Sequence, residues 1–470
     1  MLWVIIYAVF QGFGIISAVH ATTTVRTSQG AIAWAACLLT MPLVAVPLYW
    51  VFGRNKFQGM AEAFQDRATE IAADVARARK ALAPFGKTDD LGPSERSLEA
   101  LTAMKVLQPN RLKLLVDGKA TFDDIVAGIE KAKDYVFVQF YIFRSDALGR
   151  RIGDALVARA KEGVRCYILY DEVGSLSLAS SWVHEMRRAG VEVRKFDTTR
   201  GWTNRFQLNF RNHRKIVVVD GHTAWIGGHN VGIEYLGEDP KRGPWRDTHV
   251  RIEGPAAIEA QGVFMGDWYW ATRSLPKVSY DPVVPEGATA RVLVAPSGPS
   301  TKLETASLIS VELLHVAKQR VWIATPYFIP DRAVMAALRG AALRGVDVRI
   351  MITEKCDSLP TDLAAYWYLD QLGGVGIRFF RYTAAFMHAK AVLVDDQVAS
   401  IGTVNWDSRS FRLNFEVSAL IHDPTFASQV ETMFLSDFKR CREVGSTELS
   451  ERGWFFNSAV HASRLLSPIL

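Results

Sequence analysis

Two long apolar stretches separated by a short polar linker open the chain. Residues 2–19 carry no formal charge, and neither do residues 27–53, which follow the single Arg26. A helix needs about 20 apolar residues to cross a bilayer, so each stretch is close to the required length. A cleaved signal peptide would require Lys or Arg before its apolar stretch, and neither precedes the first stretch here. The pattern predicts a transmembrane helix hairpin over residues 1–56, kinked at the prolines of its second half.

Helical and strand-like apolar patterns then alternate along the chain. Residues 60–83 have helical spacing and predict an exposed helix inside a spacer and linker that spans residues 57–106. Helical segments alternating with short apolar runs fill residues 107–275 and again residues 291–470, with a proline-rich linker at 276–290 between them. We therefore predict an α/β fold made of two duplicated sandwich lobes, each a mixed sheet flanked by helices.

Composition and the end of the chain add weaker constraints. Aromatic and aliphatic residues from Trp454 onward surround Arg452, His461 and Arg464, which predicts an amphipathic segment: an interfacial helix, a partner-binding helix or a core helix. The net charge of +6 fits an anionic partner, either a lipid surface or nucleic acid. The four Cys are scattered and no Cys/His cluster has metal-ligand spacing, so we predict neither disulfides nor a metal.

One set of polar residues occurs twice with identical internal spacing. The two copies are His213, Lys215, Asp220 and Asn230, then His388, Lys390, Asp395 and Asn405. In each copy an apolar run between Lys and Asp predicts a buried strand, on which His and Lys share one face. Buried charged groups cost free energy unless they are paired, so packing does not explain the duplication. The repeat predicts one site built from both lobes.

This repeated pattern resembles that of the phospholipase D superfamily. Other segments are similar to bacterial cardiolipin synthases, and the likeness covers nearly the whole chain. These segments are residues 212–220, Gly227-Gly-His-Asn230, Trp245-Arg-Asp-Thr-His249 and Ser410-Phe-Arg-Leu-Asn-Phe-Glu416. The chain departs from the commoner superfamily pattern at Gly228, where Ser is frequent, and has Thr403 in the other copy.

The resemblance implies chemistry on a phosphodiester, whose anionic oxygens repel nucleophiles. Lys215 and Lys390, aided by the two Asn amides, are suited to neutralising that charge. One imidazole can attack phosphorus while the opposite one protonates the departing alcohol, without a metal or another cofactor. Reacting contacts of about 3 Å on each side would place the two ring nitrogens roughly 6 Å apart.

Carboxylates are expected to orient the two imidazoles. Asp247 and Glu416, each lying downstream of its own copy, are the candidates. The alternative for Asp247 is a surface ion pair with Arg246. The resemblance places Asp220 and Asp395 in the catalytic sets, whereas their positions at the strand ends favour anchoring of Lys or of neighbouring backbone.

Four further residues are candidates for substrate binding. Tyr141 and Tyr327 end equivalent strands and are expected to line the pocket or to pack as ordinary aromatic residues. Gly228 and Thr403 follow the site strands, where backbone donors and the Thr hydroxyl could bind phosphate. The segment 194–211 interleaves cations with aromatics, which suits lipid headgroups, single-stranded nucleic acid or a solvated loop.

The resemblance implies a membrane-bound cardiolipin synthase of the bacterial inner membrane, crossing it more than once. It would transfer a phosphatidyl group between two phosphatidylglycerol molecules through a phosphatidyl-histidine on His213, with His388 as acid and base, and release glycerol. The symmetry of the two copies leaves the nucleophile open. No nucleic-acid partner is expected. A hydrolytic phospholipase D, a membrane-anchored nuclease and a non-catalytic lipid scaffold are the alternatives. Arg54 and Lys56 predict a cytoplasmic catalytic region.

Overall fold

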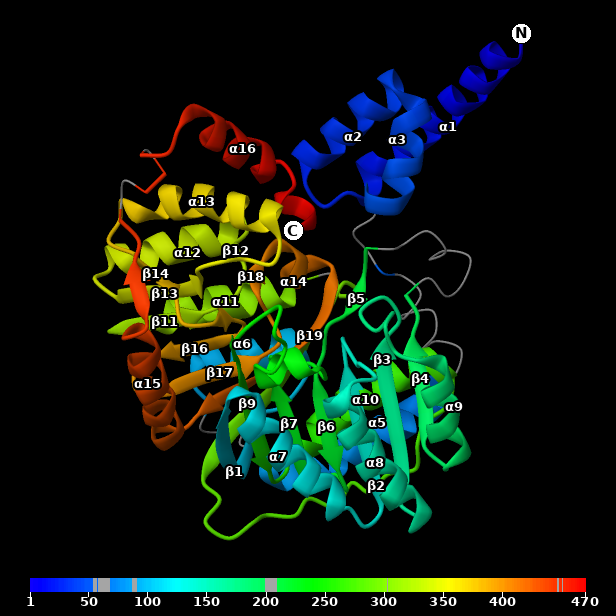
Figure 1. The fold of residues 1–470 in the computed structure, drawn as a ribbon, viewed down its shortest axis with the longest axis vertical. Helices are drawn as coiled ribbons and strands as arrows, with labels where there is room; N and C mark the ends of the chain where they lie inside the picture. Colours follow the sequence, from blue (N-terminus) through cyan, green and yellow to red (C-terminus); the bar gives the residue numbers. More distant parts are fainter. Residues whose placement is uncertain are drawn as a thin grey trace.

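Two α/β lobes lie side by side, and a group of N-terminal helices projects from one end of the molecule (Figure 1). The computed structural model describes residues 1–53, 57, 68–86, 91–198, 209–301, 303–445, 448–449 and 451–470. Helices alternate with buried strands through both lobes, so the duplicated α/β architecture predicted from the apolar pattern is confirmed.

The strands of the two lobes follow the same spatial order. In the first lobe the order is β1 (Leu107–Val116), β9 (Thr248–Glu253), β7 (Thr223–Gly227), β6 (Ile216–Val219), β2 (Tyr135–Phe140), β3 (Arg165–Asp171) and β4 (Glu192–Phe196). In the second it is β10 (Ala290–Ser297), β19 (Asn414–His422), β17 (Val398–Gly402), β16 (Ala391–Val394), β11 (Arg320–Ala324), β13 (Asp347–Thr353), β14 (Arg378–Tyr382) and β20 (Cys441–Glu443). The repeated order is that of a duplicated domain.

Both sheets are mixed, as predicted. Strands β2, β3 and β4 are parallel, whereas β6, β7 and β9 pair antiparallel. The equivalent strands of the second lobe have the same relative directions. Strands β1 and β10 pair antiparallel at the centre, so the two lobes share one continuous sheet.

Helices cover both faces of this sheet and close three apolar cores. The helices on one face are α7 (Asp117–Glu130), α8 (Ala147–Lys161), α9 (Ser180–Arg188), α11 (Thr305–Val316), α12 (Arg332–Leu343) and α13 (Leu359–Gly373). They close a separate core in each lobe. Helices α10 (Ala256–Thr272) and α15 (Pro424–Phe438) pack on a third core that contains strands of both lobes. This shared core fixes the lobes against each other.

The N-terminal helices differ from the two-span prediction. Helix α1 (Leu2–Thr24) packs against α2 (Ser28–Thr40) and α3 (Pro42–Leu48), which a short π-helix follows at Tyr49–Gly53. The second apolar stretch is therefore broken at Met41, because a proline cannot sit inside a regular helix without losing a hydrogen bond. Among the described residues, only α1 has the length and hydropathy to cross a membrane.

The spacer between these helices and the first lobe is partly helical. Helix α5 (Ala68–Leu82) agrees with the second half of the predicted spacer helix, and residues 58–67 lie outside the described part of the chain. Helix α6 (Pro93–Thr102) lies where a linker was predicted. Its start is stabilised by Pro93 in the first turn and by the Glu95 carboxylate, which accepts the Gly92 backbone N–H.

Candidate active site

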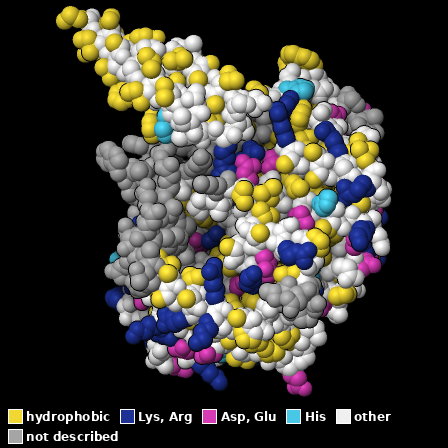
Figure 2. Space-filling view, turned by 180° about the vertical axis from the view of Figure 1, so that it is seen from behind, with side chains coloured by type: hydrophobic (Ala, Val, Ile, Leu, Met, Phe, Trp, Pro, Cys, Tyr) yellow, Lys and Arg dark blue, Asp and Glu magenta, His cyan; other side chains and the backbone are white. Residues whose placement is uncertain are grey.

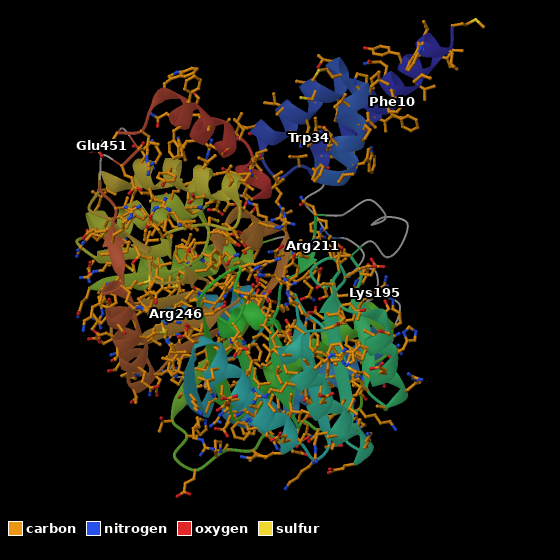
Figure 3. All side chains as sticks on the ribbon, in the orientation of Figure 1. Phe10, Trp34, Lys195, Arg211, Arg246 and Glu451 are labelled. Atoms are coloured by element: carbon orange, nitrogen blue, oxygen red, sulfur yellow. The ribbon has the colours of Figure 1, made fainter. Side chains whose placement is uncertain are left out.

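Immediately before each of the two His residues, a short strand of one lobe pairs with a strand of the other lobe. Strand β5 (Arg211–Asn212) pairs with the start of β19, and β15 (Phe386–Met387) pairs with β8 (Trp245–Arg246). Arg211 and Arg246, at these two crossings, are labelled in Figure 3. The backbone N–H of His213 then donates to Phe415 O over 2.9 Å, and that of His388 donates to Arg246 O over 2.7 Å. Each His is thus attached to the opposite lobe.

This crossing gives each imidazole a carboxylate from the other lobe. Nδ1 of His213 lies 2.8 Å from Oε2 of Glu416, and Nδ1 of His388 lies 2.6 Å from Oδ2 of Asp247. The sequence named both carboxylates as candidates but did not decide which imidazole each one serves. A carboxylate on Nδ1 fixes the ring and leaves Nε2 for chemistry.

The two carboxylates are held differently. Glu416 accepts bonds from the Thr403 hydroxyl over 2.5 Å and from the Asn414 amide over 3.0 Å. Asp247 accepts the Thr248 backbone N–H over 2.7 Å and packs over Gly228. A Cβ added to Gly228 would lie 2.0 Å from Oδ1 of Asp247, so a side chain does not fit there. The departure from Ser at this position thus makes room for the Asp247 carboxylate.

The two Lys ammonium groups are buried between these pairs. Lys215 Nζ donates to His213 O over 2.6 Å, and Lys390 Nζ donates to His388 O over 2.5 Å. Among the described residues each ammonium has this single hydrogen-bond acceptor, although it carries three N–H donors. Two buried cations with donors to spare form a site for an anion such as a phosphodiester.

Electrostatics distinguish the two halves of the site. Burial lowers the pKa of His213 to about 4, although Glu416 opposes the shift, and burial together with Lys390 and Lys215 lowers that of His388 well below its usual value. Burial raises the pKa of Asp247. Burial also acts to raise that of Glu416, but His213 and its other partners outweigh it and the pKa is lowered. Glu416 is therefore the more firmly ionised carboxylate.

Burial also disfavours the charged forms of the two Lys residues. Burial lowers the pKa of Lys390 to about 8 and that of Lys215 well below its usual value, although Glu416 and Asp247 oppose both shifts. Lys215 also lowers the pKa of His388 in the other lobe, and Lys390 lowers that of His213. These cross-lobe effects show that both copies of the motif form one electrostatic unit.

Comparisons with known proteins agree with this geometry. The family model described as "Cardiolipin synthase, PLD-like domain" matches residues 125–239 and 310–438, one segment in each lobe. Cardiolipin synthase A of Pseudomonas putida (strain W619) is 47% identical over 463 residues, covering 97% of this chain and 96% of that protein. Cardiolipin synthase A of Pseudomonas fluorescens (strain SBW25) is 45% identical over 467 residues, covering 98% and 97%.

The chain belongs to the cardiolipin synthase family. Family membership makes it a phosphatidyltransferase of the phospholipase D superfamily. The crystal structure of phosphatidylserine synthase from Haemophilus influenzae Rd KW20 superposes with a TM-score of 0.60 at 18% identity, covering 80% of this chain and 99% of that one. At that identity the likeness shows the shared fold alone.

The motif aspartates lie outside the imidazole cluster of this family member. Asp220 accepts backbone N–H bonds from Lys133, Asp134 and Tyr135, and Asp395 does the same for residues 318–320. At about 3.3 Å per residue, the five-residue step from Lys215 to Asp220 spans roughly 16 Å. The geometry gives both aspartates an anchoring function, so their inclusion among the catalytic residues is corrected.

The two motif amides differ in their contacts. Asn230 Oδ1 accepts the Ile142 backbone N–H over 3.0 Å, and its Nδ2 donates to the Tyr235 hydroxyl over 2.8 Å. This amide therefore fixes the loop after β2, and its Nδ2 is directed at Tyr235. Asn405 is buried, and its Oδ1 has no hydrogen-bond partner among the described residues.

The two candidate tyrosines occupy different surroundings. The Tyr141 ring meets His213 edge-on with centroids 5.2 Å apart, and Lys215 Nζ lies 5.6 Å from its centre. Tyr327 instead donates its hydroxyl to Asp357 over 2.8 Å. The structure thus places Tyr141 against the imidazole of its lobe and ties Tyr327 to a neighbouring loop. Of the segment 194–211, residues 199–208 lie outside the described part.

Several residues around the site were missed by sequence reasoning. The His388 ring is surrounded by the rings of Tyr235, Trp245 and Phe386 at 5.4–5.9 Å between centroids. The alternative for Asp247, an ion pair with Arg246, does not occur among the residues that the structure describes, because Arg246 pairs with Asp437 over 2.7 Å. The signal for the aromatic residues was their position next to the motifs, but spacing alone does not show which lobe an aromatic ring faces.

A buried polar network behind His213 was also missed. Arg214 donates to Asp267 over 2.7 Å and to Glu416 O over 3.0 Å, which ties the first lobe to the carboxylate strand of the second. Asp267 also accepts the amides of Gln139 and Asn212. The usable signal was Asp267, an acidic residue among the tryptophans of α10, because a buried charge needs a partner.

Proposed function

We propose that the chain makes cardiolipin by transferring a phosphatidyl group from one phosphatidylglycerol to the glycerol head of a second, releasing glycerol. The observation that carries this proposal is the pair of reciprocal carboxylate–imidazole contacts, which puts two oriented imidazoles and two buried ammonium groups in one site. Family membership supports the choice of substrate.

In the first step His213 Nε2 attacks phosphorus and the bond from phosphorus to the glycerol oxygen breaks. Glu416 is ionised and stabilises the positive charge that the His213 ring acquires. His388 Nε2 gives its proton to the departing glycerol oxygen. Asp247 has a raised pKa, so the Asp247–His388 pair can hold the proton that this step requires.

In the second step the hydroxyl of the acceptor phosphatidylglycerol attacks phosphorus. His388 Nε2 takes the hydroxyl proton, the phosphorus–nitrogen bond breaks and His213 is restored as a neutral ring. Lys215 and Lys390 balance the phosphate charge through both steps. Water in place of the acceptor would give phosphatidic acid by the same route.

Product analysis tests this proposal. The purified full chain, given phosphatidylglycerol in mixed micelles, should yield cardiolipin and glycerol in equal amounts by mass spectrometry. His213→Ala and His388→Ala should each abolish both products. His222→Ala is the matched control, because His222 lines a separate cavity beside Asp220. Phosphatidic acid without cardiolipin would refute the transferase assignment and favour hydrolysis, and cleavage of single-stranded nucleic acid with lipids ignored would favour a nuclease.

We further propose that α1 crosses the bacterial inner membrane, that the apolar α2–α3 segment is embedded with it, and that the lobes face the cytoplasm. The apolar surface of α1 and the position of Arg54 and Lys56 after the second stretch support this placement. Single cysteines introduced at the start of α1 and in the lobes should label with a membrane-impermeant reagent from opposite sides of sealed vesicles, because Arg26 of the α1–α2 turn pairs with Glu304 of the second lobe. Labelling of both from the same side would refute the crossing.

A further inference from the structure

The C-terminal helix α16 (Trp454–Arg464) has one packed face and one exposed apolar face. Its packed face lies on α13, where Val460 is buried and the Phe456 ring meets Tyr366 edge-on. The opposite face exposes Trp454 by 73% and Phe455 by 83%. In the turn that follows, Leu465 is 79% exposed and Leu466 is 42% exposed.

The ionisable side chains of this segment are all basic. Residues 452–470 contain Arg452, Arg464 and His461 but neither Asp nor Glu. The Arg464 guanidinium lies 3.9 Å from the Trp367 ring centre, at the junction of α16 with α13. Exposed aromatics beside cations without acidic residues suit the interface of an anionic bilayer, where rings enter the headgroup layer and cations meet phosphates.

Helix α16 lies at the end of the molecule that carries the N-terminal helices. Figure 1 places α16 at the same end of the long axis as α1, α2 and α3, on the outer side of α13. In Figure 2 the projecting N-terminal segment shows hydrophobic and uncharged atoms on the visible face, whereas Lys, Arg, Asp and Glu side chains gather over the lobes. A membrane that holds α1 would therefore also lie next to α16.

Helix α14 (Ser408–Arg412) connects both of these segments to the site. Arg412 lies 3.0 Å from Glu304, which also pairs with Arg26 of the α1–α2 turn over 3.2 Å. Arg409 donates its backbone N–H to Leu470 O over 2.9 Å and its side chain to Ile469 O over 3.0 Å.

The same Arg409 side chain also donates to Asn209 O over 2.8 Å, four residues before His213. The membrane helices and the C-terminal tail therefore hold one short helix, which contacts the segment that enters the site.

We propose that the exposed face of α16 and the turn after it, formed by Trp454, Phe455, Leu465 and Leu466, is a second lipid-binding surface that lies in the interface of the anionic bilayer crossed by α1. This inference rests on the proposed membrane function. Two attachments to one membrane, both tied to α14, fix the orientation of the lobes and bring the site to the lipid surface.

Photocrosslinking of the full chain tests this surface. Phe455→p-benzoylphenylalanine is irradiated in vesicles of phosphatidylglycerol and phosphatidylethanolamine, and lipid adducts are counted by mass spectrometry. Leu343→p-benzoylphenylalanine is the matched control, because Leu343 is 75% exposed at the end of α12 and outside the proposed surface. Position 455 should give about tenfold more lipid adducts than position 343. Equal adducts at both positions, or adducts at 455 to a second copy of the chain, would overturn the proposal.

An activity measurement separates this surface from the proposed reaction. The double variant Trp454→Glu, Phe455→Glu should make cardiolipin about tenfold more slowly from vesicles and at the parent rate from detergent micelles, where no bilayer must be engaged. Leu343→Glu should match the parent in both. Parent rates from vesicles would contradict the lipid surface, while phosphatidic acid as the sole product of the parent would contradict the proposed reaction instead.

Discussion

The crossed carboxylate–imidazole pairs predict different kinetic defects for Glu416→Gln and Asp247→Asn. Both carboxylates are fully buried and lie within 2.8 Å of their imidazoles. A carboxylate about 4 Å from the centre of a charged ring stabilises it by about 4 kcal/mol at an effective dielectric constant near 20. An amide that keeps the hydrogen bond recovers about 1 kcal/mol. The net loss of about 3 kcal/mol corresponds to roughly a hundredfold in rate.

A phosphatidyl ester of p-nitrophenol separates the two steps, because its leaving group needs no proton. In rapid-quench experiments Glu416→Gln should slow the nitrophenolate burst by about a hundredfold, since Glu416 supports the attacking His213. Asp247→Asn should keep the burst and slow turnover by a similar factor, so that phosphatidyl-enzyme accumulates. Asp220→Asn is the control and should change neither phase.

The opposite pattern would refute this reasoning. A normal burst in Glu416→Gln with a slowed burst in Asp247→Asn would show that His388 is the nucleophile. An equal loss of the burst in both variants would mean that the two imidazoles do not have separate functions. Each variant must first show the parent circular dichroism spectrum and melting temperature, because removal of a buried charge can unfold a site.

Three further results are expected. Gly228→Ala should lower kcat about tenfold or more, because its Cβ would displace the Asp247 carboxylate; a parent-like kcat in the folded variant would contradict the close packing. Burial lowers the pKa of Lys390 to about 8, so this side chain loses its positive charge as pH rises through about 8. We expect kcat/KM to fall over the same pH range. Lys390→Arg should move that fall to higher pH, because a guanidinium stays charged, and an unmoved profile would assign the titration elsewhere. Asp220→Ala should lower stability by about 1–3 kcal/mol in urea unfolding but keep kcat, because its three backbone bonds are structural.

The local parts of the fold could be read from residue patterns because they depend on neighbours in the chain. The apolar run between Lys215 and Asp220 predicted the buried strand β6, and its copy predicted β16. The pattern failed at helix α6, where a capped first turn outweighed a polar composition typical of a linker. It also treated the second apolar stretch as one span, although Pro42 divides it.

Residue spacing along the chain identified the groups that are available for the proposed chemistry. The spacing of His213 and Lys215, repeated at His388 and Lys390, specified two imidazoles and two cations, because a strand places residues two apart on one face. The partner of each imidazole, Glu416 for His213 and Asp247 for His388, became clear from the folded structure. Asp247 and Glu416 lie downstream of their own copies, yet the pairing of β5 with β19 and of β15 with β8 carries each His to the other lobe. Spacing along a chain fixes local geometry, whereas a contact between lobes depends on how distant strands pair.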